Sequence, residues 1–309
     1  MTGQPSALQV VEGIDLSGKV CVITGASSGL GREAARALAA AGAHAVLASR
    51  NQDALTETAQ WISAAVPGAQ TSTVHLDLTS LASVRAAAAA IRNITPVIHV
   101  LMNNAGVMFT PFGRTHDGFE IQIGTNHFGH FELTRLLVPQ LTAADGARVV
   151  VLSSGGYVMG DVDLTDPNWE RRDYDKFVAY GASKTANILH AIEVDNRFRG
   201  IGVRAYAVHP GTVATSLARY MSRSDFSQLR QYAAAGTSSR GEPTDGYLDF
   251  TTPEYVAATQ VWAAISPELA GRGALYLEDC HVSETVTTYA QDAEHAEALW
   301  ALSEKLCAK

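Results

Sequence analysis

The chain has little of three features that mark common classes of protein: basic charge, paired cysteines and long apolar runs. Its 309 residues include 23 lysines and arginines against 31 acidic residues, which gives a net charge of -8. Because phosphate groups need a basic surface, this balance argues against a nucleic-acid partner. The three cysteines, Cys21, Cys280 and Cys307, lie far apart and show no metal-ligand spacing. They predict reduced thiols and no metal site.

Segments that direct a protein into or across a membrane are also missing. Residues 1–15 lack a basic segment followed by an apolar core, so they do not have the pattern of a secretory signal. No uninterrupted apolar run approaches the ~20 residues that a membrane-spanning helix needs. We therefore expect a cytoplasmic protein without a membrane span.

What the chain does have, from Lys19 onward, is a regular alternation of short apolar runs and longer amphipathic ones. The short runs are nearly continuous in their apolar character, which is typical of parallel strands covered on both faces. The alternation predicts an α/β protein: one doubly wound Rossmann domain with a parallel sheet and helices on both faces. The predicted strands are Val20–Thr24, Ala45–Ala48, Thr71–His75, Val97–Met102, Arg148–Leu152, Val203–His209 and Ala274–Leu277. The predicted helices are Gly31–Ala41, Asp53–Ala65, Leu81–Ile91, Phe119–Leu141, Tyr180–Phe198 and Pro253–Ile265.

Two stretches interrupt this alternation. Residues 155–179 form a charged insertion, and residues 216–252 form a polar one after the sixth strand. A long insertion beside the carboxyl ends of strands is more often a binding loop than a linker, so we predict a substrate lid at 216–252. A surface loop without function is the alternative. The expected organisation is an N-terminal extension, 1–15, followed by a single domain, 16–309.

A glycine-rich turn, Thr24–Gly31, follows the first strand and opens the first helix. Glycines allow close approach of the backbone to a phosphate, and the helix N-terminus offers free N–H groups to it. The second strand ends at Ser49-Arg50-Asn51, where a site for NAD usually has an acidic residue. Arg50 can instead pair with a 2′-phosphate, so NADP(H) is favoured over NAD(H).

Tyr180 and Lys184 lie four residues apart on a predicted helix and therefore face the same way. A neighbouring cation favours the phenolate, which lowers the pKa of the tyrosine towards the range of a proton-transfer catalyst. The spacing alone can arise by chance. His127 and His130, at a separation of three, lack a third ligand at a known spacing, so packing is favoured over a metal site.

These motifs, taken in order with Asn103–Gly106 and Pro210-Gly211, resemble the short-chain dehydrogenase/reductase family over about Leu16 to Cys280. The stretches Asn103–Met108, Asn126–Phe131 and Tyr276–Cys280 resemble its NADP-dependent, retinol-dehydrogenase-like branch. The resemblance implies that the catalytic residues are Asn126, Ser154, Tyr180 and Lys184, with Ser154 preferred to Ser153. It implies cofactor contacts from Gly25, Ser27, Ser28, Gly29, Leu30, Gly31, Arg50, Asn51, Asp77, Leu78, Asn104, Ala105, Gly106, Tyr180, Lys184, Pro210, Gly211, Val213 and Thr215.

Some of these contacts have a plainer structural alternative. Asp77, expected on the adenine side, could equally cap the third helix, and Thr215 could belong to a simple turn. Asn126 could be a buried polar group satisfied by the backbone, a role compatible with catalysis.

The activity implied is NADP(H)-dependent interconversion of a small apolar ketone or aldehyde and its alcohol, with Tyr180 as general acid and base. Ser154 would hold the substrate oxygen, Lys184 would bind the nicotinamide ribose, and Asn126 would orient a water. A homodimer, a homotetramer and a monomer all remain open. Alternative functions are an NADP-binding regulatory protein without catalysis, a 3-oxoacyl reductase and an enzyme like light-dependent protochlorophyllide reductase. The net acidity and the Asn103-Asn104 pair, where the last group has a cysteine, argue against the two enzymatic alternatives.

Overall fold

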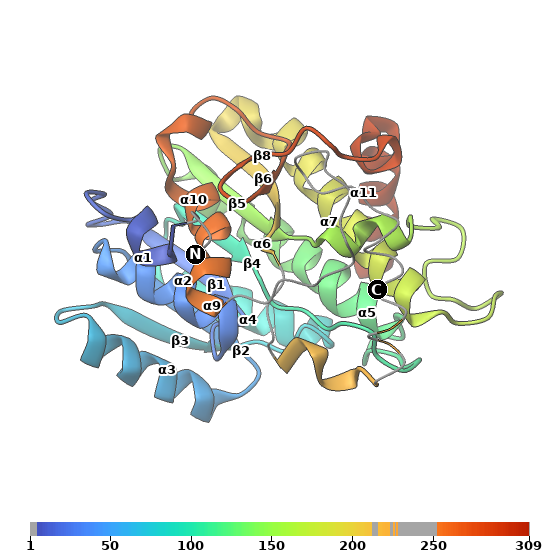
Figure 1. The fold of residues 1–309 in the computed structure, drawn as a ribbon, viewed down its shortest axis with the longest axis horizontal. Coiled ribbons are helices and arrows are strands. Elements are labelled where there is room, and N and C mark those ends of the chain that lie inside the picture. The colour runs from blue at the N-terminus through green and yellow to red at the C-terminus, as the bar shows by residue number, and fades with distance from the viewer. Residues whose placement is uncertain (1–4, 212–215, 223–224, 226, 228–251, 309) are drawn as a thin grey trace.

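A mostly parallel sheet of eight strands, in the order β3-β2-β1-β4-β5-β6-β7-β8, organises the structure (Figure 1). The computed structural model describes residues 5–211, 216–222, 225, 227 and 252–308. Neighbouring strands from β3 to β7 are parallel, and β8 pairs antiparallel with β7. The doubly wound Rossmann fold expected from the sequence is confirmed. The strands are β1 (Val20–Thr24), β2 (His44–Ser49), β3 (Thr71–His75), β4 (Val100–Asn103), β5 (Ala147–Leu152), β6 (Val203–His209), β7 (Leu275–Glu278) and β8 (His281–Val282).

Helices cover both faces of this sheet, because successive side chains of each strand point to opposite sides. In β5, Val149 and Val151 join one core, and Val150 and Leu152 join the other. The first core is covered by α4 (Leu81–Ile94), α6 (Gly129–Thr142), α7 (Lys176–Phe198) and α11 (Ala293–Cys307). The second is covered by α1 (Ala7–Val10), α2 (Gly29–Ala40), α3 (Gln52–Ala65) and α10 (Ala258–Ile265), which follows the short helix α9 (Pro253–Val256).

Three predicted helices differ from the observed ones, and the one expected over Pro253–Ile265 is divided into α9 and α10. The single helix expected over Phe119–Leu141 is α5 (Ile121–Ile123), a π-helical turn at Gly124–Phe128 and then α6. The helix expected to begin at Tyr180 begins at Lys176, because the Asp175 carboxylate accepts hydrogen bonds from the amides of Phe177 (2.8 Å) and Val178 (3.2 Å). The cap places Tyr180 in the second turn of α7, with helical residues both before and after it.

Two helices at the ends of the described chain have no counterpart in the sequence prediction. Within the N-terminal extension, α1 packs on α2 and α10. The last helix, α11, lies along α7 and also contacts α6 (Figure 1). Arg85 of α4 holds its end by donating hydrogen bonds to the Cys307 carbonyl at 2.6 Å and to buried Glu132 at 3.0 Å. As a result, α7 is buried on nearly all sides.

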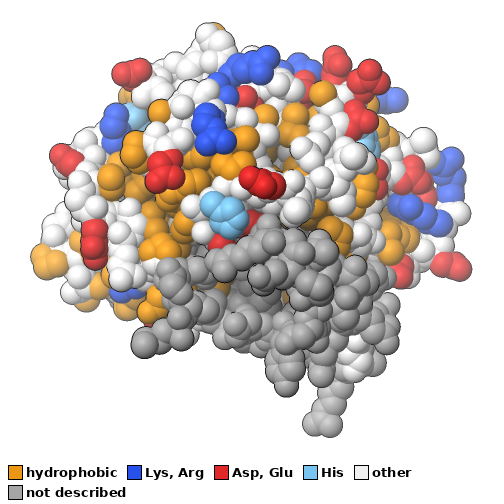
Figure 2. Space-filling view, turned by 45° about the horizontal axis from the view of Figure 1, so that its top comes forward, with side chains coloured by type: hydrophobic (Ala, Val, Ile, Leu, Met, Phe, Trp, Pro, Cys, Tyr) orange, Lys and Arg blue, Asp and Glu red, His pale blue; other side chains and the backbone are white. Residues whose placement is uncertain are grey.

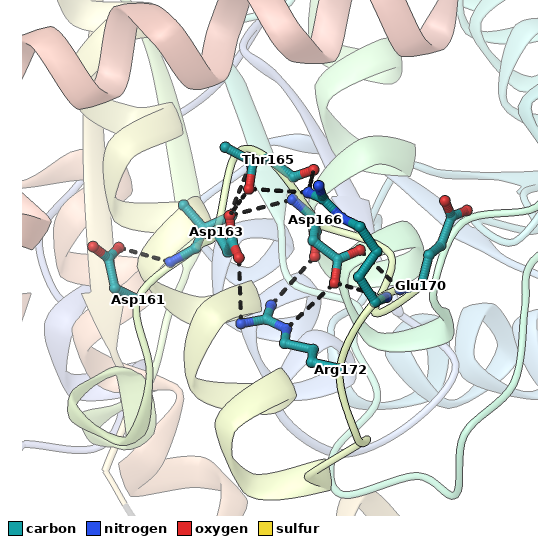
Figure 3. Close-up of polar contacts among 8 residues, drawn as sticks. Asp161, Asp163, Thr165, Asp166, Glu170 and Arg172 are labelled. Atoms are coloured by element: carbon teal, nitrogen blue, oxygen red, sulfur yellow. Dashed lines mark hydrogen bonds and ion pairs between the residues drawn. The ribbon is translucent and has the colours of Figure 1, made fainter.

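The charged insertion at 155–179 begins in a 3-10 turn, Gly155–Met159, and ends in the first turn of α7; in the loop between them Arg172 pairs with two aspartates (Figure 3). The Arg172 guanidinium lies 3.6 Å from Asp163 and 3.7 Å from Asp166. Asn168 accepts a hydrogen bond from the amide of Glu120, just before α5, at 3.0 Å. This bond fixes the loop to the segment that carries Asn126.

The predicted lid at 216–252 lies largely outside the described residues. In its described part, Asp225 pairs with Lys176 at the start of α7, with 2.6 Å between Oδ2 and Nζ. In the described chain as a whole, no helix is long and apolar enough to cross a membrane. On the face seen in Figure 2, acidic and basic side chains are interspersed among apolar ones.

Three histidines are buried: His127 in the π-helical turn, His130 in α6 and His190 in α7. Burial lowers the pKa of His127 well below its ordinary value, that of His130 to about 4 and that of His190 to about 3. Neither ring nitrogen of His190 has a hydrogen-bond partner among the described residues, and its ring stacks on Trp300.

We predict that replacing His190 by phenylalanine makes the protein less sensitive to acid. Below pH ~6.5 the unfolded chain binds a proton at residue 190 and the folded chain does not, so stability falls by about 1.4 kcal/mol per pH unit. His190→Phe removes this contribution. Urea unfolding at pH 8 and pH 5 should show the variant gaining about 2 kcal/mol on the wild type between the two conditions. An equal difference at both pH values would contradict the prediction.

Candidate active site

The N-terminus of α2 is built to receive an anion. Ser28, the N-cap residue, makes no side-chain hydrogen bond to the first turn of α2. The backbone amides of that turn therefore remain available to an anion. Gly25 has a left-handed φ of 68°, and a Cβ on Gly31 would lie 2.5 Å from the carbonyl oxygen of Gly25. Only glycine fits at both positions. These residues therefore fit the pyrophosphate of a dinucleotide.

A hydrogen-bonded chain joins this loop to Asn126. The Thr24 hydroxyl accepts from the amides of Asn104 (2.9 Å) and Ala105 (3.0 Å) and lies 2.8 Å from Nε2 of His130. Nδ1 of His130 lies 3.0 Å from the carbonyl oxygen of Asn126 and must carry the proton. Nε2 is therefore an acceptor, and Thr24 donates to it. Both ring nitrogens are used, and no group of three metal-ligating side chains occurs among the described residues.

The residues expected at the adenosine end follow β2 and β3. Arg50 is exposed directly after β2, and the Ser27 and Ser49 hydroxyls lie 2.9 Å apart beside it. Asn51 caps α3 by accepting from the amide of Ala54 at 3.1 Å. Asp77 does not cap α4, a role that Ser80 fills; instead it accepts from the amide and hydroxyl of Thr79. Among the described residues, no hydrogen bond uses the second carboxylate oxygen of Asp77.

Tyr180 and Lys184 are both buried on α7, beside the end of β5. Burial raises the pKa of Tyr180 to about 12, partly opposed by a hydrogen bond with the Ser154 hydroxyl. Burial also lowers the pKa of Lys184 to about 7, and its Nζ donates to the Leu152 carbonyl at 2.9 Å. The expected lowering of the tyrosine pKa by lysine is thus not found. Burial would strengthen the attraction between a Tyr180 phenolate and a Lys184 ammonium. Burial also disfavours each of these charged forms relative to the neutral one.

The two adjacent serines after β5 have different surroundings. The Ser153 hydroxyl donates to the backbone carbonyl of Lys184 at 2.9 Å. The Ser154 hydroxyl accepts from the amide of Gly156 at 3.1 Å and adjoins the Tyr180 phenol. A Cβ on Gly156 would lie 3.0 Å from the tyrosine ring and 3.4 Å from Ser154 Oγ, so this glycine keeps the space between them open.

Asn126 lies in the π-helical turn, a local irregularity that occurs frequently at functional sites. Its Oδ1 accepts from the Val107 amide at 2.8 Å, and its Nδ2 donates to the Val107 carbonyl and to Ser183 Oγ, each at 2.9 Å. A Cβ on Gly106 would lie 3.1 Å from Asn126 Oδ1 and 3.7 Å from Lys184 Nζ. Asn126 and Lys184 therefore meet at Gly106.

Other predicted contacts lie at the same edge of the sheet, and some lie beyond the described chain. Pro210 and Gly211 follow β6, with Gly211 at a φ of 99°, whereas Val213 and Thr215 are outside the described residues. Leu78 packs against Gly129 of α6, where a Cβ would lie 2.7 Å from the Leu78 carbonyl oxygen.

Sequence reasoning assigned no supporting hydrogen bond to four polar residues that hold this site together. Thr24, His130 and Ser183 support the glycine loop and Asn126 as described above. The fourth, His209, accepts from the amide of Gly155. Its place directly before Pro210-Gly211 is the one signal of its location at the sheet edge.

An apolar wall lies beside the Tyr180 phenol. Phe109, at a left-handed φ of 52°, has its ring centroid 4.5 Å from that of Phe177 and 5.0 Å from that of Tyr180. Met159 completes this cluster. Next to Phe177 an open pocket of about 330 Å³ is lined by Pro111, Tyr174, Asp175, Lys176, Phe177 and Asp225.

A Rossmann sheet with a glycine-rich helix N-terminus, and with a buried tyrosine and lysine beside a partly exposed serine at its carboxyl edge, is typical of a nucleotide-dependent oxidoreductase. The chain belongs to the short chain dehydrogenase family, whose family model matches residues 19–225. Members act on CH–OH or C=O groups with a nicotinamide dinucleotide.

The curated relatives support the branch inferred from the motifs. Human retinol dehydrogenase 13 is 35% identical over 94% of this chain and 85% of its own. A "Probable oxidoreductase" of Streptomyces lividans is 38% identical over 93% of this chain and 97% of its own. The crystal structure of an uncharacterised protein from Mycobacterium paratuberculosis has 32% identity and a TM-score of 0.76, covering 99% of this chain and 98% of that one. The retinol-dehydrogenase-like branch is thereby confirmed.

The clamped amide of Asn126 gives a testable prediction. Asn126→Asp removes both donors to Val107 O and Ser183 Oγ and places a buried carboxylate against a carbonyl oxygen, so it should lower the free energy of unfolding by about 3 kcal/mol. Asn93→Asp, on the exposed side of α4, is the matched control and should cost less than about 1 kcal/mol. Urea denaturation measures both. Equal losses would show that the amide is not clamped in this way.

Proposed function

We propose that the protein is an NADP(H)-dependent oxidoreductase that interconverts an apolar ketone or aldehyde and its alcohol. The observation that carries this proposal is the buried phenol of Tyr180, which lies beside the Ser154 hydroxyl and an apolar wall. The phenol is the buried proton donor that carbonyl reduction needs. The hydroxyl next to it can hold the same substrate oxygen.

The roles of the four proposed catalytic residues follow from their contacts. The bound nicotinamide would supply or accept the hydride. Tyr180 would donate its proton to the carbonyl oxygen in reduction and accept it in oxidation, and Ser154 would stabilise the charge that develops on that oxygen. Lys184, whose pKa of about 7 lies near neutrality, can return a proton towards Tyr180. Asn126 fixes the backbone beside Lys184 at Gly106.

Burial keeps the Tyr180 phenol in its protonated form at neutral pH, as the reductive direction requires. At pH 7 the phenol is protonated and ready to donate, because its pKa is about 12. In a dry site its hydrogen bonds to the reacting oxygen are stronger than in water. The apolar wall of Phe109, Met159 and Phe177 supports an apolar substrate, since it excludes water from the phenol.

The preference for NADP(H) rests on Arg50. Its exposed guanidinium follows β2 directly, at the position where an acidic residue would favour the ribose hydroxyls of NAD. A guanidinium binds a 2′-phosphate through charge-assisted hydrogen bonds. Because the relatives include retinol dehydrogenases, retinal and retinol are the first substrates to test, followed by aromatic and steroid ketones.

We predict that Tyr180→Phe abolishes catalysis and leaves cofactor binding intact. The phenylalanine ring fills the same space but has no proton to transfer, so kcat for NADPH oxidation with the fastest carbonyl substrate should fall at least ~100-fold. The NADPH dissociation constant, measured by fluorescence, should change less than about threefold. Tyr255→Phe, on α9 and exposed, is the matched control and should keep full activity. A Tyr180→Phe enzyme with more than about a tenth of the wild-type kcat would reject the mechanism.

We also predict that Arg50→Ala weakens binding of NADPH about 10- to 100-fold, the effect of losing charge-assisted hydrogen bonds to one phosphate. Binding of NADH, which lacks that phosphate, should change less than about threefold. Isothermal titration with both nucleotides measures the difference. Arg92→Ala, on the exposed side of α4, controls for the loss of a positive charge. Unchanged NADPH affinity in Arg50→Ala would refute the preference.

A further inference from the structure

We infer that His209 is a positioning residue for Ser154: its imidazole holds the amide of Gly155 and thereby aims the serine hydroxyl at the substrate oxygen. This inference rests on the proposed function of Ser154. His209 is the last residue of β6 and lies in the strand next to the one that leads into Ser154.

The hydrogen bond between Gly155 and His209 takes the place of a backbone hydrogen bond between β5 and β6. The parallel pairing of β5 and β6 ends with Leu152 opposite Val208 and a hydrogen bond from the Ser153 amide to the Val208 carbonyl at 2.8 Å. Along a parallel ladder the donors recur every second residue, so the next donor is the amide of Gly155. That amide bonds Nδ1 of His209 at 3.0 Å. A side chain thus extends the pairing by one step, at the point where the chain turns towards Tyr180.

The chemistry of the imidazole is fixed by this bond. Because Nδ1 accepts from a backbone N–H, its lone pair must be free and the ring proton must lie on Nε2. Burial lowers the pKa of His209 to about 4, so the ring is neutral and keeps its acceptor at neutral pH. The nearby Asp279 carboxylate acts in the opposite direction but does not outweigh burial.

The ring also packs against the residue that it bonds. A Cβ on Gly155 would lie 3.2 Å from Nε2 and 3.5 Å from Cε1 of His209, so the ring lies close against the glycine. Ser154 is extended, with φ -171° and ψ 151°, and its hydroxyl accepts from the amide of Gly156. The Ser154 side chain is therefore oriented by a short turn whose middle residue is held by His209.

The consequence is that His209 acts on the reaction without touching the substrate. Without the acceptor, the Gly155 amide loses its partner and the turn can move to find another. A displacement of about 1 Å at a catalytic group lowers rates by about 100-fold. The effect should appear in kcat and only while Ser154 is present to be misplaced.

Four proteins and their double-mutant cycle test this role: the wild type, His209→Leu, Ser154→Ala and the double variant. His209→Leu should lower kcat for the fastest carbonyl substrate 10- to 100-fold, with the NADPH dissociation constant within about threefold of the wild type. In the Ser154→Ala background, the same leucine substitution should lower kcat less than about threefold further, because the two residues act as a unit. Independent losses that multiply in the double variant would overturn the inference.

His209→Asn is the matched rescue variant, because its Oδ1 can occupy the place of Nδ1 and accept from the Gly155 amide. It should recover kcat to within about fivefold of the wild type. An asparagine variant as impaired as the leucine variant would contradict the role of the acceptor. If Ser154→Ala itself keeps full activity, both the proposed function and the inference fail. If Ser154→Ala and His209→Leu each lower kcat and their losses multiply in the double variant, only the inference fails.

A measurement on the unmodified protein is independent of how the variants fold. Long-range ¹H–¹⁵N spectra distinguish the two neutral tautomers of an assigned histidine. At pH 7 the His209 ring should carry its proton on Nε2. A proton on Nδ1 would overturn the inference directly.

Discussion

The hydrogen bond from Lys184 Nζ to the Leu152 carbonyl is the contact on which the site depends most. It joins the largely buried helix α7 to the carboxyl end of β5. Asn187, one turn further along α7, donates to the same carbonyl at 2.8 Å. The two donors fix both the axial position and the rotation of α7. The position of Tyr180 relative to Ser154 follows from that placement.

A second set of contacts links the two halves of the dinucleotide-binding edge. The chain from Thr24 through His130 to Asn126 joins the glycine loop to the π-helical turn by way of one neutral imidazole. The side chains of this chain are buried, and most of their polar atoms are hydrogen-bonded. Water cannot replace a bond that is broken, so a displacement at one end strains the other. His209 has a comparable role on the other side of the sheet edge. In both places a neutral histidine bonds a backbone group near the site, the Asn126 carbonyl in one and the Gly155 amide in the other.

Most of the fold, and the proximity of the proposed catalytic residues, could be predicted from the sequence because they follow from local patterns. The apolar strands, the glycine loop and the Tyr180–Lys184 spacing each occupy a short window. The π-helical turn was not predicted because one extra residue in a turn leaves the apolar periodicity of the surrounding helix almost unchanged. The start of α7 was missed because its cap, Asp175, lies within a run of charged residues. The contact between His209 and Gly155 joins residues 54 positions apart, and only the register of β5 and β6 brings them together.

The position of α11 has a consequence for how the chain is made. This helix follows all eight strands in the sequence, yet it supplies Leu299, Trp300 and Cys307 to the core beneath α7. A chain still on the ribosome can form the sheet while that side of α7 remains uncovered and apolar. Domains in which a late element completes an apolar core expose that surface during synthesis, and they are open to aggregation or to chaperones until that element has been made. The helix that carries Tyr180 and Lys184 is therefore shielded from water only after the whole sheet has been synthesised.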